Sequence, residues 1–245
     1  MTIIDLQELF VKADRYLDGT EVYDPQKAKE LFSKFLQEAR KQGANGGKQY
    51  VHALLALGVI YEREHNVPLA QKYLLKVFEK KGEYPEFGAD AAFYLFYLHR
   101  AENNLQEMLK WGHVIHQFKE FPRLAGEVTY SLGGWYHENG QPEKAIEWWL
   151  KAICFGKKSA WSTAWSADAL AHHYSAHGDY KSAEKWWLFV VDYRKGARCT
   201  AADAASELSK LYRKQGKILE AEKYLERAKN WDHAIREVVG SGGIW

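Results

Sequence analysis

The sequence has few cysteines and few prolines, and it has no marked excess of charge of either sign. Its 245 residues include two cysteines, Cys154 and Cys199, which stand 45 positions apart (199 − 154) and cannot build a disulfide framework. We expect them to be buried or free thiols in a reducing compartment. Only five prolines occur, and none interrupts the strongest helical patterns, which favours an all-α chain.

Charge and hydropathy argue against two classes of partner. There are 34 basic and 32 acidic residues, a formal net charge of +2, so there is no electrostatic footprint for nucleic acid. No stretch approaches the roughly 18 apolar residues that a membrane helix needs. The first ten residues carry Asp5 and Glu8, where a signal peptide would have a basic start and an apolar run. We therefore expect a cytoplasmic protein that binds neither nucleic acid nor membrane.

Motifs of catalysis are also missing. The sequence contains no glycine-rich phosphate loop, no serine nucleophile elbow and no Cys–His pairing. It therefore predicts a protein that is not an enzyme and that needs no cofactor.

What the sequence does contain is an internal repeat. Residues 127–154 form two helical patterns joined by a turn, and they read EVTYSLGGWYHENGQPEKAIEWWLKAIC. Ala145 of this stretch recurs as Ala183 and then Ala221, both times after 38 residues (183 − 145 and 221 − 183). Three further columns move with the alanine at the same step: Leu132, Leu170 and Leu208; Tyr136, Tyr174 and Tyr212; Gly140, Gly178 and Gly216.

Three earlier segments are looser copies of the same unit. One of them keeps Leu57, Gly58 and Ala70 in the expected places, whereas the next has Met108 in place of the alanine. The loosest copy, at the N-terminus, carries Ala28. We predict one repeat domain over 1–245, with units at about 6–41, 50–81, 88–118, 126–156, 164–194 and 202–230 and a capping helix at 231–240.

The small residues of the repeat have predicted places. Two antiparallel helices can meet closely only where their side chains are small, so Gly133 is expected to face Ala145. The glycines of the third column are expected to end the first helix of each pair in the left-handed conformation. Trp245, at the end of the chain, is expected to fill a pocket or to act as a docking tag.

The order Leu132, Gly133, Tyr136, Gly140, Ala145, Trp149, Ala152 resembles a tetratricopeptide repeat (TPR). The 38-residue step exceeds the 34 of standard TPRs, and AIEWWLKA (145–152) resembles the Sel1-like subclass. The resemblance implies an all-α, right-handed α-solenoid of about six antiparallel helix pairs.

The resemblance also implies a groove lined by the first helix of each pair. The positions that it assigns to the groove are His52, Leu55, Val59, Glu62, Arg63, Asp90, Phe93, Tyr97, Arg100, Glu127, Tyr130, Gly134, His137, Glu138, Trp165, Asp168, His172, Ser175, Asp203, Ser206, Lys210, Arg213 and Lys214. This surface is aromatic in the middle and basic towards its C-terminal end. Tyr, Trp and Arg are the usual anchors of protein interfaces.

Three functional hypotheses follow. The first is a non-enzymatic scaffold or adaptor that binds a peptide or a partner domain in this groove. The alternative is a dedicated immunity protein or chaperone that neutralises one toxin or effector. The third is a metal-dependent enzyme at His172, His173 and His177, since the last two stand four apart on a helix as zinc ligands do. The sequence offers neither a neighbouring glutamate nor a further ligand there, so we predict no metal.

Overall fold

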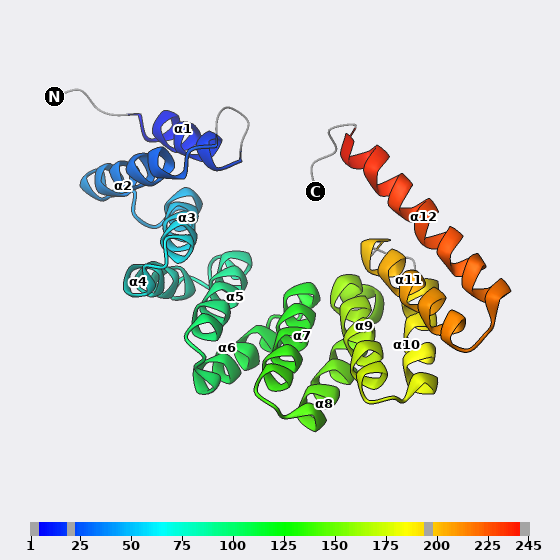
Figure 1. Ribbon diagram of the computed structural model, residues 1–245. Helices are drawn as coiled ribbons and strands as arrows, with labels where there is room; N and C mark the ends of the chain where they lie inside the picture. The colour runs from blue at the N-terminus through cyan, green and yellow to red at the C-terminus, as the bar shows by residue number, and fades with distance from the viewer. Residues whose placement is uncertain (1–4, 19–22, 194–197, 241–245) are drawn as a thin grey trace. The chain divides into compact units, whose positions relative to one another are not determined.

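The chain folds into helices throughout the part that can be described. The computed structural model describes residues 5–18, 23–193 and 198–240, and this part contains helices and turns but no strand. It divides into two compact units, Met1–Phe121 and Pro122–Trp245 (Figure 1). The single repeat domain over the whole chain stays a prediction. The predicted role of Trp245 concerns a residue that lies outside the described ranges.

Each unit consists of helix pairs that follow one another along the chain. In the first unit the helices are α1 (Leu6–Asp18), α2 (Pro25–Lys41), α3 (Lys48–Arg63), α4 (Val67–Phe78), α5 (Pro85–Ala101) and α6 (Leu105–Gln117). In the second unit they are α7 (Pro122–Glu138), α8 (Pro142–Ile153), the 3-10 helix η1 (Gly156–Ser159), α9 (Ala160–Ala176), α10 (Tyr180–Asp192), α11 (Arg198–Lys214) and α12 (Ile218–Gly240). The predicted all-α architecture of stacked helix pairs is confirmed.

The repeat columns form the core of both units. The alanine column is completely buried at all six places: Ala28, Ala70, Met108, Ala145, Ala183 and Ala221. The leucine column is equally buried: Leu57, Leu95, Leu132, Leu170 and Leu208 are at most 1% exposed. In three pairs the tyrosine of the first helix lies against a ring of the second: Tyr61 against Tyr73, Tyr136 against Trp148 and Tyr212 against Tyr224. One 38-residue period thus corresponds to one helix pair and the buried residues between its two helices.

The turns between paired helices share one backbone geometry. Gly140, Gly178 and Gly216 have φ of 69°, 78° and 76°, as predicted for glycine after a helix. The corresponding places of the second and third pairs hold His65 and Asn103, with φ of 57° and 56°. These two residues adopt a conformation that costs less for glycine than for any other residue.

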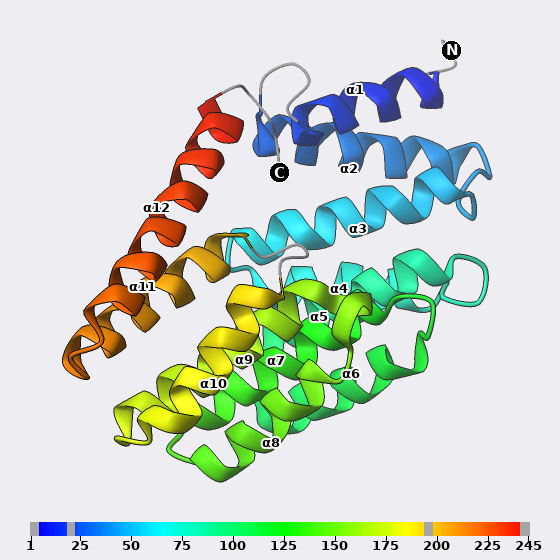
Figure 2. The ribbon, with the colours of Figure 1, turned by 90° about the vertical axis from the view of Figure 1, so that its right-hand side faces the viewer.

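Two local expectations are corrected. Gly133 faces the ring of Trp149, not Ala145, and a Cβ at Gly133 would collide with that indole. The missing side chain therefore makes room for a large ring, not for a second small residue. Residues 231–240 continue α12 without a break, because no glycine or proline interrupts the sequence from Ile218 to Val239. They are the last turns of a long helix that runs beside α11 and beyond it (Figure 2).

Candidate functional site

The predicted groove positions fall into two sets, one on each unit. Nearly all of them lie on half-exposed or exposed faces of the first helices of the pairs. The exception is Leu55, which is 8% exposed and belongs to the core. Its burial follows from the place of α3, which packs against α2, α4 and α5. Leu55 is therefore removed from the candidate site.

In the first unit, the groove position His52 joins three helices. Its ring lies 5.4 Å from the ring of Phe10 on α1 and stacks at 5.7 Å on Phe87 of α5. Its Nε2 atom is 3.9 Å from a carboxylate oxygen of Asp14. Lys48 extends over the other side of this cluster, with Nζ 3.0 Å from Glu86 and 5.6 Å from the Phe87 ring. These contacts pack the His52 ring against α1 and α5.

The remaining groove positions of the first unit are also engaged. Phe93 and Tyr97 pack edge to face at 4.8 Å on α5. Arg63, at the end of α3, donates a hydrogen bond of 2.7 Å to the hydroxyl of Tyr23. Val59 and Glu62 are half-buried on the same helix. This face is aromatic, but its polar groups are largely occupied by neighbours within the unit.

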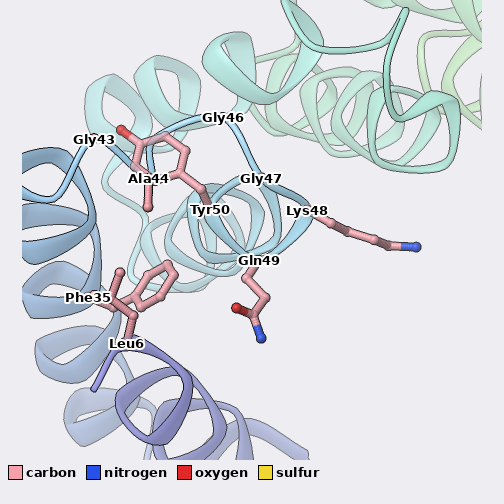
Figure 3. A pocket seen from close by; sticks show the side chains of 9 residues that line it. All are labelled: Leu6, Phe35, Gly43, Ala44, Gly46, Gly47, Lys48, Gln49 and Tyr50. Atoms are coloured by element: carbon pink, nitrogen blue, oxygen red, sulfur yellow. The ribbon is translucent and has the colours of Figure 1, made fainter. Parts of the chain in front are cut away.

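The first unit also contains a cavity that the sequence analysis did not predict. It measures about 500 Å³ and lies where the start of α1, the end of α2 and the start of α3 meet (Figure 3). Its lining residues are Leu6, Phe35, Gly43, Ala44, Gly46, Gly47, Lys48, Gln49 and Tyr50. The closely spaced glycines Gly43, Gly46 and Gly47 were the available signal in the sequence. In the structure, a Cβ added at any of the three would meet no atom within 4 Å, so the space beside them is open. The residues that line it include no Asp, Glu or His.

In the second unit, the first helices carry a run of half-exposed aromatic rings. The rings of Tyr130 on α7 and Trp165 on α9 are 5.6 Å apart, and Trp161 lies 5.6 Å from Trp165. The helices meet closely here because Gly126 of α7 faces the Ser159 hydroxyl, and a Cβ at Gly126 would collide with it. This aromatic run stays half-exposed along the surface of the unit.

Asp168 lies one turn beyond Trp165 on α9. Its side chain is 21% exposed, and its Oδ2 atom is 3.5 Å from Nε2 of His172. The Oδ1 atom is buried and has no hydrogen-bond partner among the described residues. Burial raises the pKa of this carboxyl to about 6, against the influence of His172 and with the help of negative charge on Asp203 and Glu207 of α11. Two carboxylates of α11 thus act on a carboxylate of α9.

The C-terminal end of α11 has the opposite charge. Lys210 pairs with Glu207 at 2.6 Å, and Arg213 and Lys214 are exposed in the last turn. Sequence reasoning found this basic end and assigned both Asp168 and Asp203 to the groove. It did not find that Asp203 and Glu207 act on the Asp168 carboxyl, because that depends on how α9 and α11 pack.

The three candidate metal-binding histidines do not converge. The rings of His173 and His177 are 4.3 Å apart, but Nδ1 of His177 lies 2.8 Å from the carbonyl oxygen of His173. The ring of His172 instead packs on Trp187 at 5.5 Å. Burial, together with the neighbouring His177 and His137, lowers the pKa of His173. Among the described residues, no three His, Cys, Asp or Glu side chains are placed to hold a metal ion.

Two further sequence expectations concern thiols and membranes. Cys154 and Cys199 are free and exposed. Within the described ranges, none of the helices combines the length and the apolar character that crossing a membrane requires.

Comparisons with known proteins bear on the fold. Residues 201–229 match the family model described as "tetratricopeptide repeat". The crystal structure of BtubC (BKLC) from P. vanneervenii is similar at a TM-score of 0.59 and 14% identity, over 95% of this chain and 93% of that one. The apo quorum sensor NprR from B. thuringiensis is similar at a TM-score of 0.55 and 17% identity, over 92% of this chain and 64% of that one. No curated protein matches the sequence.

These likenesses concern the fold, and the Sel1-like subclass stays a prediction. The family match covers α11 and the start of α12, the last of the helix pairs. The other pairs repeat the same buried columns and the same turn. The chain is thus similar in fold to tetratricopeptide repeat proteins, and its last helix pair matches the family model itself.

Proposed function

We propose that this protein is a non-enzymatic scaffold that binds a protein or peptide on the exposed face of α7, α9 and α11. The observation that carries the proposal is the aromatic run of Tyr130, Trp165 and Trp161, which lies beside charged residues on adjacent first helices. Large rings that stay half-exposed are favourable anchors for a partner. Repeat proteins of stacked helix pairs use such extended faces for binding.

The charged residues suit recognition better than catalysis. Asp168 follows Trp165 on α9, and Lys210, Arg213 and Lys214 are exposed on α11, so these first helices carry both signs of charge. Charges at the rim of an interface steer a partner and select against wrong ones. No nucleophile–base pair accompanies these charges among the described residues of this face.

The proposal is tested by affinity capture from the native source with the full chain as bait. The double variant Tyr130→Ala with Arg213→Glu removes one ring and reverses one charge of the proposed face. The matched control is Tyr180→Ala with Lys181→Glu, which makes the same chemical changes at exposed positions of α10. We expect the first variant to lose the captured partner and the control to keep it. Equal capture by both folded variants would refute this binding face.

A further inference from the structure

Three histidines gather where the C-terminal ends of α7 and α9 meet. The ring of His137 on α7 lies 6.0 Å from the ring of His173 on α9, and the His173 ring lies 4.3 Å from the ring of His177 at the end of that helix. We propose that these three imidazoles form a pH-sensitive contact between the helix pairs α7–α8 and α9–α10. The contact is closed while the imidazoles are neutral, and it loosens when they take up protons.

The first argument is the way the ring nitrogens are held. Nδ1 of His177 lies 2.8 Å from the carbonyl oxygen of His173, so this nitrogen carries a hydrogen and donates it. Nδ1 of His173 is buried and has no hydrogen-bond partner among the described residues. In the neutral tautomer with the hydrogen on Nε2, this nitrogen stays uncharged. A proton added there would become a buried, charged N–H without an acceptor, which costs much more than a neutral unpaired nitrogen.

The second argument is the charge around His173. Its two neighbours in the contact are themselves histidines, which become positive over the same range of pH. Glu143 of α8 also acts on His173, but more weakly than burial and the two histidines do. Together these effects lower the pKa of His173 below its ordinary value of 6.5. Protonation therefore brings like charges together on rings that are in contact.

The acidic groups of the other helices that pack against α9 are engaged elsewhere. Asp179 caps α10 by accepting from a backbone N–H of that helix, and Glu184 accepts from a tyrosine hydroxyl of α11. Asp192 is the last residue of α10, at its other end. The acidic groups of α11 act on the middle of α9. Within the described part of the chain, Glu143 is thus the acidic group that acts on His173.

The contact holds the last turn of α9 against the neighbouring pair. The His137 ring also packs on the Trp149 ring of α8 at 5.5 Å, so it connects both helices of its own pair to α9. After α9 the chain turns through Gly178 and Asp179, whose N–H groups bond to carbonyl oxygens of the last turn. We expect protonation to open this turn and to weaken the contact with α7, while the buried columns of each pair stay intact.

The sign of the effect follows from the direction of the pKa shift. The pKa of His173 is lower in the folded state than its ordinary value of 6.5. The stability that neutral His173 gives to the contact is therefore present above about pH 6.5 and is lost as pH falls below it. This is opposite to the effect of Asp168, so the test must follow the end of α9 itself rather than the whole protein.

Hydrogen exchange with the full chain tests the proposal at the amides of residues 176–179. Rates at pH 7.5 and pH 5 are converted to protection factors, which removes the intrinsic dependence of exchange on pH. In wild type we expect protection of these amides to fall at least about threefold at pH 5. In the double variant His173→Gln with His177→Gln we expect no such fall. The matched control His113→Gln, which changes an exposed histidine of α6, should behave as wild type does.

Two further measurements keep the test decisive. Circular dichroism checks that the double variant is folded, and His177→Gln alone, which changes an exposed side chain, should already reduce the fall in protection. An NMR titration of the imidazole signals should find His173 taking up its proton below pH 6.5. Unchanged protection in wild type at pH 5, an equal fall in the folded variants, or a His173 that titrates at or above pH 6.5 would each overturn the proposal.

Discussion

Replacing Asp168 with asparagine should make the protein more stable at neutral pH. The amide has nearly the shape of the carboxyl but no charge, so it removes the cost of keeping a buried anion near Asp203 and Glu207. The pKa of Asp168 rises from 3.8 to about 6, and each pKa unit corresponds to about 1.4 kcal/mol, which gives a cost of about 3 kcal/mol. The exposed fifth of the side chain reduces this, so we expect a gain of about 1–3 kcal/mol.

The gain should depend on pH with a definite sign. The folded-state pKa of Asp168 is above its unfolded value of 3.8, so the folded protein binds this proton more tightly. The contribution of Asp168 to stability is therefore present at low pH and is lost as pH rises from about 4 to about 6. Asp168→Asn and wild type should be nearly equal in stability below this range and differ most above it.

Urea denaturation followed by tryptophan fluorescence at several pH values measures this difference. At pH 7.5 the variant should unfold at a higher urea concentration than wild type, and at pH 4 the two midpoints should approach each other. Glu147→Gln, at an exposed position of α8, should change stability by less than about 0.5 kcal/mol. A variant that is no more stable than wild type at pH 7.5 would show that the carboxylate is not under electrostatic stress.

Three further predictions concern the hairpins, and urea denaturation checks each. Gly133→Ala should destabilise the protein by about 1–3 kcal/mol because the new methyl group meets the Trp149 ring, and an unchanged midpoint would show that the indole can move aside. His65→Gly should stabilise it by about 1 kcal/mol by relieving a φ of 57°, and a loss would contradict this. Asn66→Ala should cost about 1 kcal/mol because the Asn66 side chain caps α4 by accepting from the Leu69 N–H, and a neutral result would show that water replaces this cap.

The helix pairs were predictable because their signal is local and repeated. Each alanine or leucine column marks residues that are buried between paired helices. Because the pattern repeats along the chain, it predicts a repeated helix pair without knowledge of any long-range contact. The contact of Gly133 was predicted wrongly because a small residue on one helix does not say which residue of the other helix fills the space. The ring of Trp149 occupies it.

The candidate site was only partly predictable. A solvent-facing helical stripe can be read from sequence, so the positions of Tyr130, Trp165 and Asp168 were found. The pKa of Asp168 is raised mainly by burial and in smaller part by Asp203, which stands 35 positions later (203 − 168). Both causes arise from the packing of helices that are separate in the sequence. Leu55 was misplaced for the opposite reason, since neighbouring helices cover a position that the repeat pattern leaves open.

The helix pairs of the second unit share one turn geometry between their first and second helices. Gly140, Gly178 and Gly216 place the chain in the same conformation at intervals of 38 residues, whatever side chains lie between them. Removing or duplicating one full period between two such glycines would join identical backbone to identical backbone and keep every buried column in register. A change that is not a whole number of periods would not. For this half of the protein, the turns therefore define the module by which the array can grow or shrink.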